Sequence, residues 1–222
     1  MVAVIGRNGI GKSTLLRTIA GLQKRLDGTI SISGKELHGH STTELARSVG
    51  YLSTEMIRAG HMTVAELVAL GRYPHTDWLG TLSSDDMEVI NNALEVTGLD
   101  FLRNRFINEI SDGERQKAMI ARILAQDTSL MIMDEPTAFL DIGSKYEILH
   151  LLHQLSRKNQ KTIIFSTHDL QMAVSQADKI WLVLDNHLIE GAPEDLIISG
   201  AFDHLFDTSP VKFNTENGTF TF

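Results

Sequence analysis

The sequence predicts an α/β fold in which a mainly parallel sheet carries an inserted α-helical subdomain. Three observations lead to this prediction. Short apolar or β-branched runs alternate with segments of helical spacing near both ends of the chain. A glycine-rich loop joins the first such run to the first helix, and the stretch of about residues 60–125 is almost wholly helical in pattern. The 222 residues, 42% of them hydrophobic, are enough for one sizeable domain.

The first quarter of the chain contains clear strand and helix signals. Residues 2–5 form a β-branched run that ends at a glycine, which predicts a buried parallel strand. Residues 12–20 have apolar side chains at helical spacing and are followed by a glycine, a natural helix stop. Further strands are expected at residues 29–32 and 49–52, separated by a short helix that the capping box at residues 41–44 opens.

The helical region begins with a second capping box, at residues 63–66, and contains a helix over residues 84–97 that stops at Gly98. After this region the alternation resumes. Strands are expected at residues 130–133, 162–166 and 180–184, and helices between them at residues 142–158 and 170–177. We assign no role to the tail after Gly200.

Composition narrows the class of partner. The net charge is −8 and no cluster of lysine or arginine is present, so nucleic acid is not expected as a partner. The chain has no cysteine, which excludes disulfides and thiolate metal sites and suits a reducing cytosol. The apolar runs are far shorter than the ~20 residues that span a bilayer, and the first residues do not resemble a signal peptide. Work at a membrane would therefore require a partner.

The glycine-rich loop matches a phosphate-binding pattern. Gly6, Gly11, Lys12 and Ser13 have the spacing G-x-x-x-x-G-K-S, between a predicted strand and a predicted helix. Backbone N–H groups of such a loop surround phosphate oxygens, the lysine reaches the β- and γ-phosphates, and the serine hydroxyl binds Mg²⁺. The predicted nucleotide-binding residues of the loop are Gly6, Asn8, Gly9, Gly11, Lys12, Ser13 and Thr14. The alternative is a glycine-rich turn that binds nothing.

Two adjacent carboxylates follow the apolar run at residues 130–133. Ligands of open α/β sheets bind at this end of a strand. Side chains alternate along a strand, so the two acids need separate roles. We expect Asp134 to hold Mg²⁺ and Glu135 to orient or deprotonate the attacking water. The alternative is a strand that ends in ordinary solvated acids.

A third motif, S-D-G-E-R-Q, runs from residue 111 to residue 116. Ser111 and Glu114 form a capping box, which is also its purely structural interpretation. A capped helix that points its N-terminus outward attracts an anion, and Gly113 would allow a phosphate to approach closely.

Taken in order, these motifs and the later T-H-D at residues 167–169 resemble those of ATP-binding cassette (ABC) ATPases over nearly the whole chain. The resemblance implies Mg²⁺-dependent ATP hydrolysis by two copies packed head to tail, so that Ser111 and Gly113 of one copy contact ATP held by the other. It implies that Asp141 belongs to the D-loop, which communicates between the two sites. It also implies that His168 steadies the γ-phosphate and the water, joining Lys12 and Glu135 as catalytic residues.

A narrower similarity lies in the helical region. Residues 63–74, 78–80 and 84–86 resemble the corresponding part of importers for iron–siderophore complexes, haem and vitamin B12. This implies an ATPase subunit on the cytoplasmic side of the inner membrane, without a transmembrane segment of its own. Its partners would be two permease subunits and, indirectly, a substrate-binding protein. We expect the permease to dock near residues 56–78, although Tyr73 and Trp78 could instead only pack the subdomain.

Three departures from the family pattern are evident. Thr54 stands where the family has a glutamine that reaches Mg²⁺ and water. The resemblance therefore implies Thr54 as a third metal-site residue beside Ser13 and Asp134, although its hydroxyl is too short to span that gap. Either a water fills in, Glu55 substitutes, or hydrolysis is slower. Asp112 stands where glycine is usual, beside a phosphate. The antiparallel strands that precede the phosphate loop in the family are missing, together with their adenine-stacking aromatic, so we expect the natural product to be longer.

Two other functions are compatible with the motifs. One is a soluble ABC ATPase of DNA repair or the ribosome, although no coiled-coil insertion, tandem cassette or basic surface is visible. The other is a module that binds ATP with impaired hydrolysis, because of Thr54 and Asp112.

Overall fold

The computed structural model describes residues 1–55, 61–185 and 187–205, and the backbone of 212–214 and 219–221. Its centre is a six-stranded sheet with the strand order β4-β5-β6-β1-β7-β8. These strands are Val49–Leu52 (β4), Leu130–Met133 (β5), Thr162–Ser166 (β6), Val2–Gly6 (β1), Lys179–Val183 (β7) and Leu188–Gly191 (β8). Neighbouring strands are parallel except for β7 and β8. This confirms the predicted α/β fold with a mainly parallel sheet.

The register of the sheet brings four chain segments to one edge. Leu52 of β4 pairs with Met133 of β5, which pairs with Phe165 of β6. Ser166 of β6 pairs in turn with Val4 of β1. Parallel strands end at the same edge, so the residues that follow β4, β5 and β1 lie close to the end of β6.

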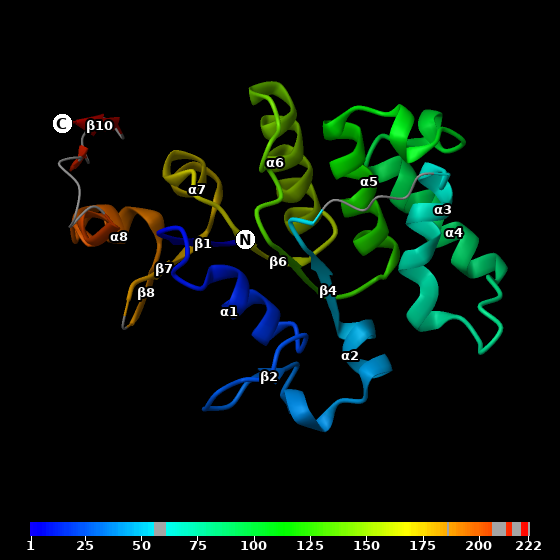
Figure 1. Cartoon of the computed structure of the whole chain (residues 1–222), viewed down its shortest axis with the longest axis horizontal. Helices are drawn as coiled ribbons and strands as arrows, with labels where there is room; N and C mark the ends of the chain where they lie inside the picture. The colour runs from blue at the N-terminus through cyan, green and yellow to red at the C-terminus, as the bar shows by residue number, and fades with distance from the viewer. Residues whose placement is uncertain (56–60, 186, 206–211, 215–218, 222) are drawn as a thin grey trace.

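Helices cover both faces of the sheet (Figure 1). On one face, Val4, Ile132 and Ile164 pack with Leu16 of helix α1, Lys12–Ile19. The other face belongs to the larger core, which includes α5, α6 and α7. These three helices are Asp112–Ala125, Ile142–Arg157 and Leu170–Gln176. The arrangement is the layered one that parallel strands require, because both of their faces are buried.

The helical region lies to one side of the sheet, beyond β4 (Figure 1). It contains α3 (Val64–Ala69), the 3₁₀ helix η2 (Leu70–His75) and α4 (Ser84–Val96), which pack with α5. Capping boxes begin all three α-helices of this group, at Thr63, Ser83 and Ser111. Each box satisfies backbone N–H groups that the first helical turn leaves unpaired, which is why these sequences start helices where they do.

The remaining elements are short. They are the strands β2 (Ser31–Ile32), β3 (Lys35–Glu36), β9 (Lys212–Asn214) and β10 (Thr219–Thr221), the helices α2 (Thr42–Ser48) and α8 (Pro193–Ile198), and the 3₁₀ helices η1 (Leu37–Gly39), η3 (Asp100–Leu102), η4 (Ile107–Glu109) and η5 (Ala201–Leu205). Within the described part of the chain, no helix combines the length and apolar character needed to cross a membrane.

Several elements differ from the prediction. The strand expected at residues 29–32 is only two residues long and pairs with β3 in a separate hairpin, outside the main sheet. Ser33 and Gly34 form its turn with φ of 51° and 80°, which matches the left-handed backbone of a tight hairpin. Strand β8 and helix α8 were not predicted, and β9 pairs with β10 in the tail.

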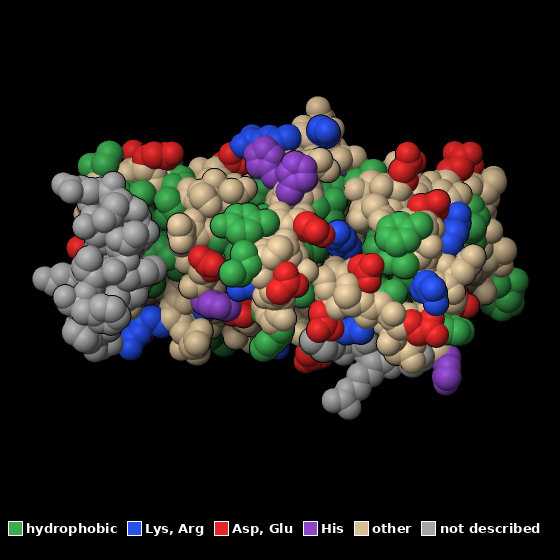
Figure 2. All heavy atoms as spheres, turned by 90° about the horizontal axis from the view of Figure 1, so that it is seen from above, with side chains coloured by type: hydrophobic (Ala, Val, Ile, Leu, Met, Phe, Trp, Pro, Cys, Tyr) green, Lys and Arg blue, Asp and Glu red, His purple; other side chains and the backbone are tan. Residues whose placement is uncertain are grey.

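Charge is mixed on the surface that Figure 2 draws. Acidic and basic side chains are interspersed there among small groups of hydrophobic side chains.

Candidate functional site

The glycine-rich loop has an open front. Gly9 and Gly11 have φ of 79° and 107°, a left-handed conformation that favours glycine. A Cβ added at either position would meet no atom within 4 Å, so the backbone conformation, not crowding, calls for glycine. Gly11 is the N-cap of α1, and no side chain caps this helix. The N-terminus of α1 therefore faces open space, as an anion site requires.

Gly6 is needed for a different reason. A Cβ at this position would lie 2.7 Å from the backbone oxygen of Val183 in β7. The glycine thus allows the end of β1 to run close to β7 before the chain turns into the loop. The other predicted loop residues follow directly: Asn8 and Thr14 are exposed, and Ser13 lies half-buried in the first turn of α1.

Lys12 lies beneath the loop. Its side chain is buried, and Nζ donates hydrogen bonds to the backbone oxygens of Gly6, at 2.9 Å, and Arg7, at 3.2 Å. Burial lowers the pKa of Lys12, and the negative charges of Glu135 and Asp134 oppose that shift. The loop thus holds a desolvated ammonium group directly behind its open front, where charge attraction to phosphate is strong.

Asp134 is fixed from both sides of β5. Its backbone N–H donates to the oxygen of Leu52 in β4, at 2.8 Å. Its Oδ1 accepts a hydrogen bond from the hydroxyl of Ser166, at the end of β6, at 2.6 Å. The residue is 2% exposed, so this hydrogen bond holds the carboxylate in one orientation inside the site.

Glu135 and His168 meet at the same edge. Nδ1 of His168 lies 3.5 Å from Oε2 of Glu135, although the two residues follow different strands. Glu135 has φ of 49°, which is uncommon for a residue with a side chain. Its N–H donates to the oxygen of the Ser166 hydroxyl at 2.8 Å, which holds this turn. Glu135 and His168, both predicted as catalytic, are therefore neighbours. Lys12, the third predicted catalytic residue, is near enough that the charge of Glu135 affects its pKa.

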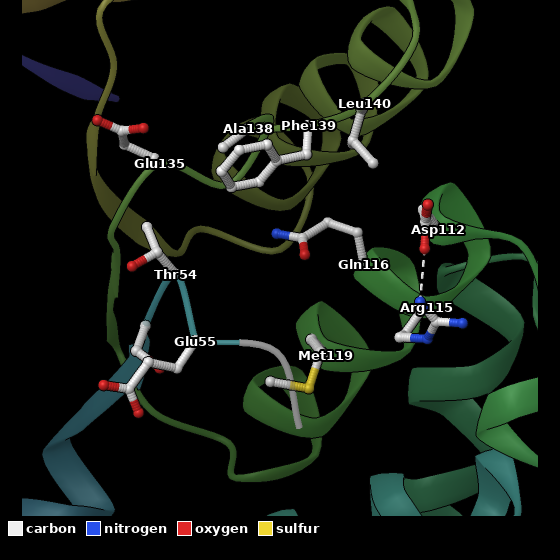
Figure 3. A pocket seen from close by; sticks show the side chains of 11 residues that line it. Thr54, Glu55, Asp112, Arg115, Gln116, Met119, Glu135, Ala138, Phe139 and Leu140 are labelled. Carbon is white, nitrogen blue, oxygen red and sulfur yellow. Dashed lines mark hydrogen bonds and ion pairs between the residues drawn. The ribbon is translucent and has the colours of Figure 1, made fainter. Parts of the chain in front are cut away.

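A pocket beside Glu135 contains the residue that departs from the family pattern. Thr54 and Glu55 lie on the same side of the pocket as Glu135, opposite α5 (Figure 3). In this view the Glu55 carboxylate points away from α5, and Gln116 of α5 points its amide toward the Thr54 side. Thr54 is exposed, and Phe139 forms another wall. The structure therefore brings Thr54 near the predicted catalytic carboxylate. Residues 56–60, which follow in the sequence, lie outside the described residues.

The predicted signature turn is built by local hydrogen bonds. The Ser111 hydroxyl accepts from the N–H of Glu114 at 3.3 Å and donates to its carboxylate at 2.8 Å. Hydrogen bonds from Ser111 lower the pKa of Glu114. Asp112 forms an ion pair with Arg115, 2.5 Å between Oδ1 and Nη1, so its charge is compensated within the same turn (Figure 3). Ser111 is exposed, whereas Gly113 is buried.

Asp141 caps helix α6. Its Oδ1 accepts from the N–H of Ser144 at 3.0 Å, and its Oδ2 accepts from the Ser144 hydroxyl at 2.6 Å. These hydrogen bonds lower the pKa of Asp141. Just before it, Phe139 has φ of 63° and is 83% exposed. Within one chain, Asp141 thus caps α6, and the Phe139 side chain near it is left largely exposed to solvent.

A second concave surface lies away from the glycine loop. The groove, about 860 Å³ in volume, runs between the end of α1, helix α2 and η2. Its lining includes the cationic side chains of Lys24, Arg25 and Arg122, and among the described residues that line it none is Asp or Glu. Of the two aromatic residues in the predicted docking segment, Tyr73 belongs to the lining, whereas Trp78 does not and is 91% exposed. Residues 56–60 of the predicted docking segment lie outside the described residues.

Sequence reasoning missed Ser166. The available signal was a hydroxyl at the end of a predicted strand, two positions before His168. Nothing in the local sequence says that this hydroxyl reaches Asp134 and Glu135, because those residues are more than one element away.

Comparisons with known proteins agree with this geometry. A family model described as "ABC transporter" matches residues 1–138. The chain is 42% identical over 205 residues to the achromobactin transport ATP-binding protein CbrD of Dickeya dadantii, covering 92% of this chain and 76% of that protein. It is 35% identical over 205 residues to the ferric enterobactin transport ATP-binding protein FepC of Escherichia coli, with the same coverage.

The fold also matches a solved structure. The ATP-binding cassette MJ0796, in a dimeric post-hydrolysis state bound to ADP and Pi, superposes with a TM-score of 0.72 at 26% identity. The match covers 87% of this chain and 85% of that one.

Proposed function

The chain belongs to the ABC transporter family and is an ATPase of the importer type, and we propose that it energises uptake of an iron chelate through a membrane. The observation that carries the proposal is the convergence of Lys12, Asp134, Glu135 and His168 at one edge of the sheet, beside an open glycine loop. A phosphate-binding cation, a carboxylate that holds Mg²⁺ and a residue that orients the attacking water are the groups that phosphoryl transfer to water uses.

ATP would bind at the loop. The N-terminus of α1 and the N–H groups of residues 9–14 would surround the phosphates, with Asn8 at the rim. Lys12 would exchange its bonds to the oxygens of Gly6 and Arg7 for bonds to phosphate oxygens. Burial lowers the pKa of Lys12, and the nearby carboxylates of Glu135 and Asp134, which favour the charged form, oppose that shift.

The donor set suits Mg²⁺. Ser13 offers a hydroxyl in the first turn of α1, and Asp134 offers a buried carboxylate whose orientation is fixed by Ser166. Both are oxygen ligands of the kind that Mg²⁺ prefers. Bound there with ATP, the ion would neutralise charge on the phosphates. Thr54, the third metal-binding prediction, offers only a short hydroxyl from the wall of the neighbouring pocket.

Glu135 would orient or deprotonate the attacking water. It is partly exposed, and its carboxylate lies 3.5 Å from Nδ1 of His168. The imidazole would limit the positions of that carboxylate and donate to a phosphate oxygen through its other nitrogen. The two residues thus act as a pair, each keeping the other in place.

A second copy would complete the site. The turn at Ser111 and the aromatic Phe139 are exposed in the single chain, and both lie near the pocket beside Glu135. An uncovered apolar side chain beside a catalytic pocket is typical of an interface. The solved relative MJ0796 is dimeric, which supports association of two copies. In the proposed head-to-tail pair, Ser111 and Gly113 of one copy would contact ATP held by the other.

The permease would dock in the groove between α1, α2 and η2. The groove combines cationic side chains with Tyr73 and Pro74, and it lies at the junction of the sheet and the helical region. CbrD and FepC carry siderophore-related names, so an iron chelate is the proposed solute, with haem and cobalamin as alternatives. The site would face the cytoplasm, beside two permease subunits served by a substrate-binding protein.

Uptake measurements test this proposal. Cells that produce Lys12→Ala in place of the native chain would be supplied with a labelled ferric siderophore, haem or cobalamin. We expect uptake of the ferric siderophore to fall to background and that of the other two to persist. Unchanged uptake of all three solutes would contradict the proposal. Co-purification with ribosomes or DNA would instead favour a soluble ABC ATPase, and binding of ATP without turnover would indicate a hydrolysis-deficient module.

A further inference from the structure

We propose that Ser166 is a positioning residue for hydrolysis, which sets the backbone of Glu135 and the carboxylate of Asp134 through one hydroxyl group. The inference rests on the proposed role of Glu135. It starts from the burial of Ser166, which is 0% exposed at the end of β6. A buried hydroxyl is costly unless it is hydrogen-bonded, and this one has partners on both sides.

The two hydrogen bonds of the hydroxyl are directional. The O–H donates to Oδ1 of Asp134 at 2.6 Å, and the oxygen accepts from the N–H of Glu135 at 2.8 Å. A serine hydroxyl has one proton, so the bond to Asp134 fixes the lone pairs that remain for Glu135. Donation to a charged carboxylate makes the first bond strong. Ser166 therefore links two adjacent residues at the end of β5 that have different roles.

The backbone of Glu135 needs such support. Its φ of 49° lies in the left-handed region, and the next residue is Pro136, which further restricts the preceding backbone. Such conformations persist where surrounding contacts enforce them. The N–H bond to Ser166 is such a contact. Loss of it would let the turn relax and swing the Glu135 carboxylate away from its place 3.5 Å from His168.

The test is a double-mutant cycle between residues 166 and 135. Single-turnover ATP hydrolysis would be measured on the full chain for Ser166→Ala, Glu135→Gln and the double variant. Ser166→Ala should lower the rate constant about 10- to 100-fold and change KM for ATP less than about 3-fold. In the Glu135→Gln background, the same substitution should lower the residual rate by a clearly smaller factor, because only its effect through Asp134 remains.

A matched control is available at the other end of β5. Thr128 is 1% exposed, and its hydroxyl donates to the oxygen of Leu130 at 3.0 Å. Thr128→Val removes a buried hydroxyl beside the same sheet without touching the site, and should leave the rate unchanged. An equal loss in this variant, or equal losses from Ser166→Ala in both backgrounds, would overturn the inference.

A second variant tests the inference even if Ser166→Ala folds poorly. Ser166→Cys keeps the side-chain shape and weakens both hydrogen bonds, and should give an intermediate rate. In the nucleotide-free protein, its Glu135 amide should exchange hydrogen faster than in the native chain, while amides at the Thr128 end stay protected. Unchanged exchange at Glu135 would contradict the inference. If Glu135→Gln itself hydrolyses ATP at the native rate, the proposed function of Glu135 fails instead.

Discussion

Gly113 at the start of α5 lies directly against Ser144 at the start of α6. A Cβ added to Gly113 would be 2.7 Å from the Ser144 hydroxyl oxygen and 3.1 Å from its Cβ. That hydroxyl is already held by Asp141, at 2.6 Å. The glycine of the proposed signature therefore has a structural reason within one chain, in addition to any close approach of phosphate from a partner copy.

The two reasons can be separated by substitution. Gly113→Ala should destabilise the chain by about 1–3 kcal/mol, because Ser144 must move and lose its bond to Asp141. Adding Ser144→Gly should restore part of the unfolding free energy in urea, since it removes the obstructing atoms but neither regains the hydrogen bond to Asp141 nor avoids the cost of a glycine in α6. ATP-dependent dimerisation should remain impaired in the double variant. Full recovery of dimerisation would mean that Gly113 matters only for packing.

Glu135→Gln should trap an ATP-bound dimer. The carboxamide cannot act as a base, so hydrolysis should fall by at least about 100-fold while the proposed phosphate contacts of Lys12 are kept. Size-exclusion chromatography with light scattering, with ATP and Mg²⁺, should show twice the monomer mass. Lys12→Ala, which removes the cation proposed to bind phosphate, should stay monomeric. A Glu135→Gln protein that also stays monomeric would contradict the head-to-tail model.

Thr54→Gln should raise the hydrolysis rate. Thr54 shares its pocket with Glu135, but its hydroxyl is short, and a carboxamide would extend toward the water and metal. One added hydrogen bond of about 0.5–1.5 kcal/mol corresponds to an increase of about 2- to 10-fold in kcat. Steady-state ATPase assays with Thr54→Ala as the control would measure it. A rate below that of the native chain would indicate that Glu55 or Gln116 already fills this role.

Local sequence patterns predicted most of the elements that build the site. The capping box at Ser111, the strand before Asp134 and the helix after the glycine loop all depend on neighbouring residues, and each forms as expected. The hairpin that contains β3 was missed because a two-residue strand has too few side chains to show alternation.

Contacts between segments that are distant in the sequence could not be predicted from local patterns. The order β4-β5-β6-β1 depends on how crossovers pack, and spacing alone does not give it. The bonds of Ser166 and the contact of Gly113 with Ser144 each join residues about 30 positions apart, where no periodicity links them. Family motifs indicated which residues matter chemically, but not which side chains hold them in place.

Charge reversal in the groove should weaken permease binding. Lys24 and Arg25 line the groove, and no Asp or Glu belongs to its described lining, so a docking segment with carboxylates fits best. Lys24→Glu combined with Arg25→Glu should lower the affinity for the permease at least about 10-fold. ATPase activity of the isolated chain should not change. Lys158→Glu, on an exposed position outside the groove, is the control and should bind normally; equal weakening there would point to net charge alone.

Asp86 should make the stability of the chain depend on pH in acid. Its carboxylate accepts hydrogen bonds from the N–H and hydroxyl of Ser83 and forms a buried ion pair with Arg72, 2.8 Å from Nε to Oδ1. Hydrogen bonds from Ser83, with that of Arg72, lower the pKa of Asp86 from 3.8 to about 2. Because the pKa of Asp86 is lower in the folded chain, its ionised carboxylate adds to the free energy of unfolding. This contribution is complete above pH ~4 and is lost as the pH falls toward ~2.

Asp86→Asn isolates this contribution. The amide leaves the Arg72 guanidinium without its counter-charge. At neutral pH the free energy of unfolding of the variant should therefore be about 3–5 kcal/mol lower than that of the native chain. Urea unfolding at pH 7, 5 and 3 should show the difference narrowing only at the lowest pH, where the carboxylate is largely protonated in the unfolded native sequence but still ionised in the folded chain. Other carboxylates titrate in both proteins and cancel in the comparison. A difference that stays constant down to pH 3 would mean that the cost comes from altered packing of the introduced amide and not from the lost charge.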